Sequence, residues 1–477
     1  MYLLSYLLLT RLLLPTTAPS QPHDHVIITS EMFVSSFIPL EQLVEEVLGL
    51  SDTTVTVEDI YAQYPGRDNP EKIRNFIRYA YENWGTTYIL LGGDVEIVPH
   101  RNVRASRLGR TGDIPCDLYY SALDGDWDAN RNGIFGEVDD SVDLIPDVFI
   151  GRLPISTAGE LDTVVSKVVA YCSDSSAPYL RRVLLTGFDL YQNPPIHGEI
   201  ACEYYDQFLV PSALKPCTKV YDSHTGNHRD SVLTALNQGQ HIWVHADHGN
   251  WDRLGTGVGN HGWVIYRHEL RNLTNGSDLC LLLSMACNVS EFDSSDCAAE
   301  ELLNAPAGGG VGTLANSQVG TLLGPDWHHT ASFLQVEWTL EELFDQPGHS
   351  ALTVLAAVQA RIAPLAETSA VYRWCQYAYS LLGEPAMPVW VPSGTSVAEP
   401  ARPAGQAGIY VLPSYVLRNL VIPGPDPMIL TDVLGRNVLR LEPGMNKLDC
   451  IPSGVYFLRT ANGASRFMGR VVKVGKE

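Results

Sequence analysis

Two short apolar runs near the middle of the chain constrain its fold more than any other feature: HIWVHA (241–246) and LCLLLS (279–284). Runs of this length with few polar residues are typical of strands buried on both faces of a parallel sheet. His248 follows the first run, and Cys287 follows the second. Because the carboxyl ends of parallel strands share one edge of a sheet, we expect this imidazole and this thiol at the same edge.

The pattern of the preceding sequence agrees with a parallel sheet. HVIIT (25–29) and TVTVEDI (54–60) have the β-branched composition of strands. Between the second of these and the next apolar run, residues 68–85 have the apolar spacing of a helix, and Asp68 is a suitable N-cap. Strands that alternate with helices predict βαβ units, and therefore an α/β fold.

The α/β pattern occurs twice. Thr157 and Glu160 form a capping box before the last predicted helix of the first half, and the alternation starts again after Pro178. We therefore predict an N-terminal α/β subdomain over residues 21–180 and a catalytic α/β subdomain over residues 181–391, packed together as one unit.

Composition divides the remainder of the 477-residue chain. Residues 1–20 are apolar but are interrupted by Arg11, so they read as a secretory signal peptide rather than a membrane span. Residues 392–408 are rich in Pro, Gly, Ala and Ser and are expected to form a linker. Residues 409–477 contain short alternating segments, which predict a small all-β domain, a β-sandwich.

The charge and the cysteine count limit the possible partners. A formal charge of -22 argues against nucleic acid and favours a surface that binds cations. The nine cysteines can form at most four pairs, so at least one thiol is left over, and a free Cys287 would account for it.

His248 and Cys287 have the residue types of a cysteine nucleophile and its general base. An imidazole within hydrogen-bonding reach activates a thiol and later protonates the leaving amine. Gly249 has no side chain, so its amide and that of Cys287 could approach a developing oxyanion. A packed core cysteine beside a hydrogen-bonded histidine is the alternative.

A metal site is a second alternative for the same histidines. His245, Asp247 and His248 resemble the second half of the H-x-H-x-D-H signature of metallo-β-lactamase-like hydrolases. Trp243 occupies the position of the first ligand and cannot bind zinc. We therefore expect no catalytic metal, and we expect His245 to pack beside or orient its neighbours.

An acidic segment, LDGDWDANRNGIFGEVDD, has the spacing of a calcium loop. Oxygen ligands at alternate positions, followed by Gly133, match the first half of an EF-hand loop. We predict a structural calcium ion, with a frame that could shift toward the N-terminus. The candidate ligands are Asp124, Asp126, Asp128, Asn130, Asn132 and Asp139.

The order of His-Gly, an apolar strand and Ala-Cys resembles the caspase-like cysteine peptidases. Within that group the chain resembles the gingipain family of bacterial cysteine peptidases. The resemblance rests on segments such as YILLGGDVEIVPHR, PDVFIGRLPIST, HADHGN, SMACN and LLGEPAMPVW. It implies a caspase-like parallel-sheet sandwich, with Cys287 as nucleophile and His248 as general base and acid.

The resemblance also implies supporting residues. Asp189 occupies the place of an acidic residue that orients the histidine, although it could instead cap a helix. Glu199, with Glu203 one turn later, is placed to bind Arg or Lys of a substrate, but a helix N-terminus favours Glu on its own. Trp327 could form a wall of the same pocket or belong to the core.

The tail, with TDVLGRNV and IPSGVYFLR, resembles the C-terminal sorting domain of type IX secretion; an ordinary binding β-sandwich is the alternative. Together these features predict a secreted or surface-attached bacterial cysteine endopeptidase. Its expected partners are protein or peptide substrates and the type IX secretion machinery. A catalytically silent, calcium-binding adhesion protein on the same fold, or a maturation peptidase that cuts only partner proteins, are the other interpretations.

Overall fold

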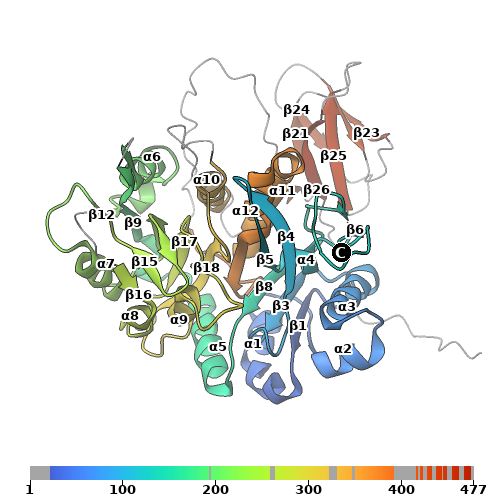
Figure 1. Ribbon diagram of the computed structural model, residues 1–477, viewed down its shortest axis with the longest axis horizontal. Coiled ribbons are helices and arrows are strands. Elements are labelled where there is room, and N and C mark those ends of the chain that lie inside the picture. The colour runs from blue at the N-terminus through green and yellow to red at the C-terminus, as the bar shows by residue number, and fades with distance from the viewer. Residues whose placement is uncertain are drawn as a thin grey trace, which may run out of the picture. The chain divides into compact units, whose positions relative to one another are not determined.

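The computed structural model describes residues 22–192, 195–257, 264–321, 330–345 and 350–391, and several strands between 415 and 473 (Figure 1). The predicted signal peptide, residues 1–20, and the predicted linker, residues 392–408, lie outside the described residues. The chain separates into two compact units, Met1–Ala398 and Glu399–Glu477. No helix among the described residues is long and apolar enough to cross a membrane.

Within the described residues, ten strands of the first unit form one sheet in the order β12-β9-β13-β17-β18-β19-β8-β3-β1-β2. Most neighbouring pairs are parallel, whereas β18 and β19 are antiparallel. β19 pairs with both β18 and β8, so the two predicted subdomains share one continuous sheet. The strands are β1 (His25–Thr29), β2 (Asp52–Thr56), β3 (Tyr88–Gly92), β8 (Phe149–Leu153), β9 (Val183–Gly187), β12 (Thr218–Tyr221), β13 (Ile242–Ala246), β17 (Cys280–Ser284), β18 (Gly310–Asn316) and β19 (Tyr379–Gly383).

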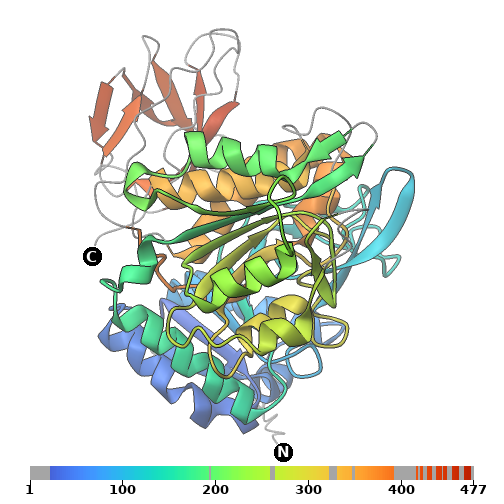
Figure 2. The ribbon, with the colours of Figure 1, turned by 90° about the vertical axis from the view of Figure 1, so that its left-hand side faces the viewer.

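Helices cover both faces of this sheet. Figure 2 shows α6 (Gly198–Phe208), α10 (Ala331–Asp345) and α11 (Ala351–Thr368) on one face, and α5 (Ala158–Ser173) and α7 (His228–Asn237) on the other. The remaining helices are α1 (Val34–Glu46), α2 (Val57–Gln63), α3 (Asn69–Trp84), α4 (Leu118–Ser121), α8 (Arg267–Arg271), α9 (Ala298–Leu303) and α12 (Ala370–Ala378), with 3₁₀ turns at Glu31–Phe33, Pro178–Arg181 and Ser212–Leu214.

The core lies between the sheet and these helices. Strands β13 and β17 are buried along their whole length, as the two apolar runs predicted. Burying each large apolar side chain contributes roughly 1.5–3 kcal/mol, so strands that are covered on both faces hold their carboxyl ends firmly in place.

Short sheets emerge from the ends of the central strands. They are the hairpin β4 (Arg101–Arg107) and β5 (Arg110–Cys116), the pair β6 (Gly125–Asp126) and β7 (Ser141–Val142), the pair β10 (Asp189–Gln192) and β11 (Pro195–His197), and β14 (Gly249–Asn250), β15 (Arg253–Gly255) and β16 (Val264–Tyr266).

Side-chain caps mark the starts of several helices. The Asp68 side chain accepts a hydrogen bond from the Glu71 amide at the start of α3, and both contacts of the Thr157–Glu160 capping box are present in α5. The strand predicted over residues 54–60 is wrong in its second half. It ends at Thr56, because the Thr56 hydroxyl caps α2 by accepting from the Asp59 amide.

Within its described residues the second unit contains strands and no helix, as the sequence predicted. Its described strands form a sheet in the order β20-β26-β25-β22-β23, and β21 pairs with β24. They are β20 (Tyr415–Val416), β21 (Asn419–Ile422), β22 (Met428–Thr431), β23 (Asn437–Leu441), β24 (Gly444–Lys447), β25 (Gly454–Thr460) and β26 (Phe467–Lys473).

Candidate active site

The register of β13 and β17 brings the two predicted catalytic residues to the same level. His245 pairs with Ser284 in this parallel pair, and His248 and Cys287 each follow three residues later. Neighbouring strands lie about 4.8 Å apart. A Cβ atom on Gly249 would lie 2.8 Å from Ala286 Cβ and 3.2 Å from the Cys287 carbonyl oxygen. Glycine therefore allows the backbone next to His248 to contact the backbone that carries Cys287.

The Cys287 side chain is partly buried, and its Sγ lies 4.0 Å from the Gly320 carbonyl oxygen. Burial raises the pKa of the Cys287 thiol, and the positive charge of Arg107 opposes that shift. The loop after β17 is held by the last residue of β18, because the side-chain amide of Asn316 donates to the carbonyls of Met285 and Ala286. A thiol in this environment needs a base to become a nucleophile.

The His248 ring is oriented by a backbone carbonyl. Its Nε2 lies 2.7 Å from the Leu190 oxygen in β10. Because a carbonyl only accepts, Nε2 carries the hydrogen, and Nδ1 of the neutral ring has the free electron pair. Tyr191, which is 45% exposed, lies edge-on to His248, with the ring centroids 6.1 Å apart.

Asp247 holds the turn that presents His248. Its carboxylate accepts from the His248 amide at 2.6 Å and from the Gly257 amide at 2.9 Å, and the residue is 2% exposed. Burial, together with the negative charges of Asp222 and Asp189, raises the pKa of Asp247 to about 7, against the effect of the two amides.

Both ring nitrogens of His245 have hydrogen-bond partners within the fold. Its Nε2 donates to the Gly255 carbonyl at 2.9 Å, and its Nδ1 lies 3.0 Å from the Ser284 hydroxyl. Burial lowers the pKa of His245 to about 4, so the ring is neutral at physiological pH. Both nitrogens are engaged within the fold, and Trp243 is completely buried.

Helix α6 packs directly on the strand ends. A Cβ atom on Gly198 would lie 2.1 Å from the Ala246 carbonyl oxygen, so only glycine allows this approach. Asp189 forms an ion pair with His197 Nδ1, and its amide donates to Asp222 at 2.5 Å. The contact with His248 is made by the next residue, through the Leu190 carbonyl.

Glu199 lies in the first turn of α6, and its carboxylate accepts from the Ser223 amide at 3.3 Å. With Glu203, Lys219 and Tyr221 it lines a hollow of about 410 Å³. Glu203 itself is paired with Lys219. Neither His248 nor Cys287 belongs to the described lining of this hollow. Trp327 lies outside the described residues.

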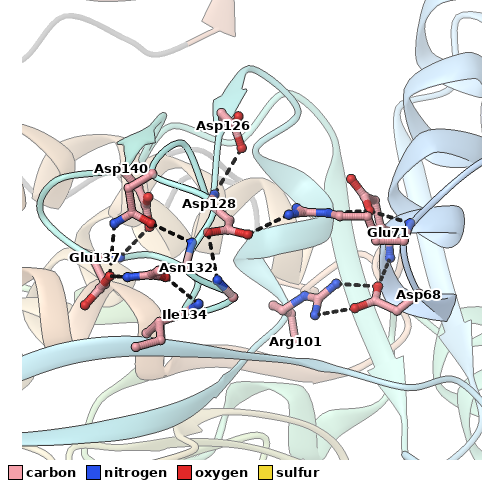
Figure 3. Close-up of polar contacts among 12 residues, drawn as sticks. Asp68, Glu71, Arg101, Asp126, Asp128, Asn132, Ile134, Glu137 and Asp140 are labelled. Atoms are coloured by element: carbon pink, nitrogen blue, oxygen red, sulfur yellow. Dashed lines mark hydrogen bonds and ion pairs between the residues drawn. The ribbon is translucent and has the colours of Figure 1, made fainter.

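The acidic segment forms a compact loop between α4 and β8. Asp128 is 2% exposed and pairs with Arg67 at 2.5 Å, while its other oxygen accepts from the Gly133 amide (Figure 3). Asp139 is exposed, whereas Asp140 is buried. Near the ends of the same segment, Asp124 forms a cluster with Asp143 and Asp147, whose carboxylate oxygens lie within 4.8 Å of one another.

Sequence reasoning missed three contributors to the His248 environment. The Leu190 carbonyl is a backbone group and leaves no mark in the sequence. The sequence indicated Asp247 only as part of a pattern that resembles a metal site. Nothing in the sequence distinguishes Tyr191 from the other aromatic residues. No disulfide forms among the eight cysteines that the structure describes, and Cys287 and Cys217 are the two that are partly exposed.

Comparison with known proteins places this site in a family context. The sequence model of peptidase family C25 matches residues 18–390. An uncharacterized protein of Archaeoglobus fulgidus is 22% identical over 300 residues, which cover 57% of this chain and 67% of that protein. Lys-gingipain HG66 of Porphyromonas gingivalis is 24% identical over 232 residues, which cover 46% of this chain but 11% of that protein.

Two solved structures share the fold. The complex of the pro- and mature domains of Porphyromonas gingivalis RgpB has a TM-score of 0.58 and 16% identity, covering 94% of this chain and 100% of that chain. The crystal structure of the Arg-specific cysteine proteinase gingipain R has the same TM-score and identity, covering 95% and 98%.

Proposed function

Since the chain belongs to peptidase family C25 and is a gingipain-like cysteine peptidase, we propose that it cleaves peptide bonds with Cys287 as nucleophile and His248 as general base. One observation carries the proposal. His248 and Cys287 each lie three residues beyond a paired position of β13 and β17, and Gly249 contacts the Cys287 backbone.

The hydrogen bonds suggest how the proton moves. With Nε2 donating to Leu190, Nδ1 of His248 accepts the thiol proton. The thiolate attacks the substrate carbonyl, and the amides of Gly249 and Cys287 stabilise the oxyanion. His248 then protonates the leaving amine, which leaves a thioester. A water molecule that gives its proton to His248 hydrolyses the thioester and releases the carboxylate product.

Alkylation tests the nucleophile without requiring the natural substrate. We expect iodoacetamide to modify Cys287 faster than Cys217, whose exposure is similar and whose pKa burial raises to about 12. The His248→Ala variant is expected to slow alkylation of Cys287 and leave Cys217 unchanged. Equal rates at both thiols, or a rate at Cys287 that does not depend on His248, would contradict the dyad.

We further propose cleavage after Arg or Lys. The support is the carboxylate of Glu199 in the first turn of α6, next to the ends of β9 and β13. A panel of fluorogenic peptides tests this preference, with Glu199→Gln expected to raise KM for basic peptides more than for neutral ones. Preference for acidic or large apolar residues would refute it.

Export is the remaining part of the proposal. The apolar residues 1–20 and the β-strand tail support secretion through the type IX route to the cell surface. Immunoblots of cell fractions test it, with deletion of residues 409–477 expected to retain the protein inside the cell.

A further inference from the structure

The β4–β5 hairpin carries two arginines directly opposite each other at its tip. Arg107 and Arg110 are cross-strand partners, so their side chains leave the same face of the hairpin. Like charges at such a pair are destabilising. Neither arginine forms an ion pair with a residue that the structure describes. The pair therefore calls for an anionic partner.

The remainder of the hairpin treats its side chains differently. On the opposite face, Arg104 pairs with Asp113 at 2.6 Å, so this arginine has a carboxylate directly across from it. On the inner face, Val103 and Ala105 are buried, and Arg107 occupies the next position of the same series. Because side chains alternate along a strand, an apolar residue at that position would continue the packed face. Packing of the hairpin therefore does not explain the arginine.

The turn between the two arginines presents an apolar side chain to solvent. Leu108 and Gly109 have φ of 50° and 75°, and a type I′ turn requires positive φ at both of these positions. Asn or Gly suits the first position of such a turn, whereas a leucine is strained there. Leu108 is also 60% exposed. A residue that is both strained and exposed does little for the fold, and such residues are typical of ligand contacts.

The inner face of the hairpin leads to the proposed nucleophile. β4 packs along α12, which carries Trp374 (Figure 1). The Arg107 guanidinium lies over the Trp374 ring, 5.7 Å from its centroid, and the same indole donates to the Val319 carbonyl at 2.8 Å. The next residue, Gly320, contacts Cys287 Sγ through its carbonyl. In agreement with this path, the charge of Arg107 opposes the rise in the pKa of the Cys287 thiol. A peptide bound at Cys287 therefore passes within reach of Arg107.

We propose that the hairpin tip binds an acidic side chain of the peptide substrate, with Arg107 and Arg110 pairing with its carboxylate and Leu108 contacting a neighbouring apolar group. This specificity rests on the proposed peptidase function. A guanidinium suits the role because it binds a carboxylate through two parallel hydrogen bonds. Charges interact over about 10 Å in 0.1 M salt, and an extended peptide rises about 3.3 Å per residue, so the acidic residue lies within about three residues of the scissile bond. The tip supplies a local attraction for acidic peptides that the formal charge of -22 does not.

Paired fluorogenic peptides test the proposal through a ratio. The two peptides of a pair share one cleavage site and differ by Asp or Asn at a single position near it. We expect the parent to show a kcat/KM about 3–10-fold higher for the Asp peptide at one or more positions. The ratio is expected to fall to about one in Arg107→Gln and to fall partly in Arg110→Gln. Arg104→Gln, on the opposite face, is the matched control and should keep the parent ratio. An effect of Arg107 on the thiol alone would change both peptides alike and leave the ratio unaltered, which would overturn the proposal.

A binding measurement separates this proposal from the peptidase function. Fluorescence anisotropy of the same peptides, labelled and added to the full-length Cys287→Ala variant, gives Kd without cleavage. We expect tighter binding of the Asp peptide, and we expect the further change Arg107→Gln to abolish the difference. Leu108→Asn suits the turn better, so it is expected to raise Kd without lowering Tm.

The outcomes are distinct. Preferential binding of the Asp peptide without cleavage of either peptide refutes the peptidase function and leaves the binding site in place. Equal cleavage and equal binding of the Asp and Asn peptides at every position refute the binding site and leave the peptidase function in place. A chain that neither binds nor cleaves these peptides refutes both.

Discussion

Replacing Asp247 with Asn removes a negative charge directly behind the proposed base while keeping the shape of the side chain. Asp247 is 2% exposed, and burial raises its pKa from 3.8 to about 7. At roughly 1.4 kcal/mol per pKa unit, ionising this buried carboxyl costs on the order of 4 kcal/mol of folding free energy.

The sign of the pH dependence follows from the direction of the shift. Because the folded pKa lies above the unfolded one, the stabilisation is complete below about pH 4 and is lost as the pH rises through about 7. The Asn side chain does not titrate, but it offers one acceptor oxygen to the two amides of His248 and Gly257. The unsatisfied amide costs roughly 1–3 kcal/mol.

We therefore expect Asp247→Asn to be less stable than the parent at about pH 4 and more stable, by roughly 1–3 kcal/mol, at about pH 9. Urea unfolding across this range measures the difference. Titration of His25 and His245 occurs in both proteins and cancels. Asp252→Asn, on the same hairpin but paired with Arg253, is the control and should follow the parent. A stability difference that does not change with pH would refute the reasoning.

Three further substitutions test other parts of the structure. Gly249→Ala places a Cβ 2.8 Å from Ala286 Cβ, so we expect a lower kcat on a fluorogenic peptide and a stability loss of roughly 1–3 kcal/mol by urea unfolding. His25→Gln leaves Asp52 and Glu384 buried without their cation and is expected to cost roughly 3–5 kcal/mol. Although burial lowers the pKa of His25, the two carboxylates raise it to about 10, so this stabilisation is full below about pH 6.5 and disappears as the pH rises through about 10. Arg152→Met leaves Asp117 without its two hydrogen bonds, and we expect a loss of similar size in the same assay, with Arg104→Met at the surface close to neutral.

Where local chemistry decides an element, the sequence predicted it. Asp68 and the Thr157–Glu160 box mark helix starts because each satisfies an amide that the helix leaves unpaired. The strand over residues 54–60 failed for the same reason, since Thr56 provides a cap that β-branched composition hides. Fold class was accessible because the buried strands carry an uninterrupted apolar pattern.

The site was predictable only at the level of strand ends. His248 and Cys287 come together because parallel strands bring equivalent positions to one edge, and this requires no knowledge of contacts farther along the chain. The hydrogen-bond partner of His248 depends on which group of β10 lies next to the imidazole ring. Sequence reasoning chose a side chain, Asp189, whereas the structure uses the neighbouring carbonyl of Leu190 and gives Asp189 to His197.

The same distinction applies to the acidic segment, where the sequence predicted side-chain positions by their spacing from Asp128. Spacing from Asp128 to Gly133 is set by the local backbone, and the Gly133 amide indeed returns to Asp128. Beyond Gly136 the chain is held by Tyr377 and Arg373 of α12, which are remote in sequence. In this part of the segment Asp140 is buried, whereas Asp139, which the spacing selected, is exposed. A motif therefore predicts side-chain positions only as far as its own backbone determines the path of the chain, and the remaining positions are set by the fold that surrounds it.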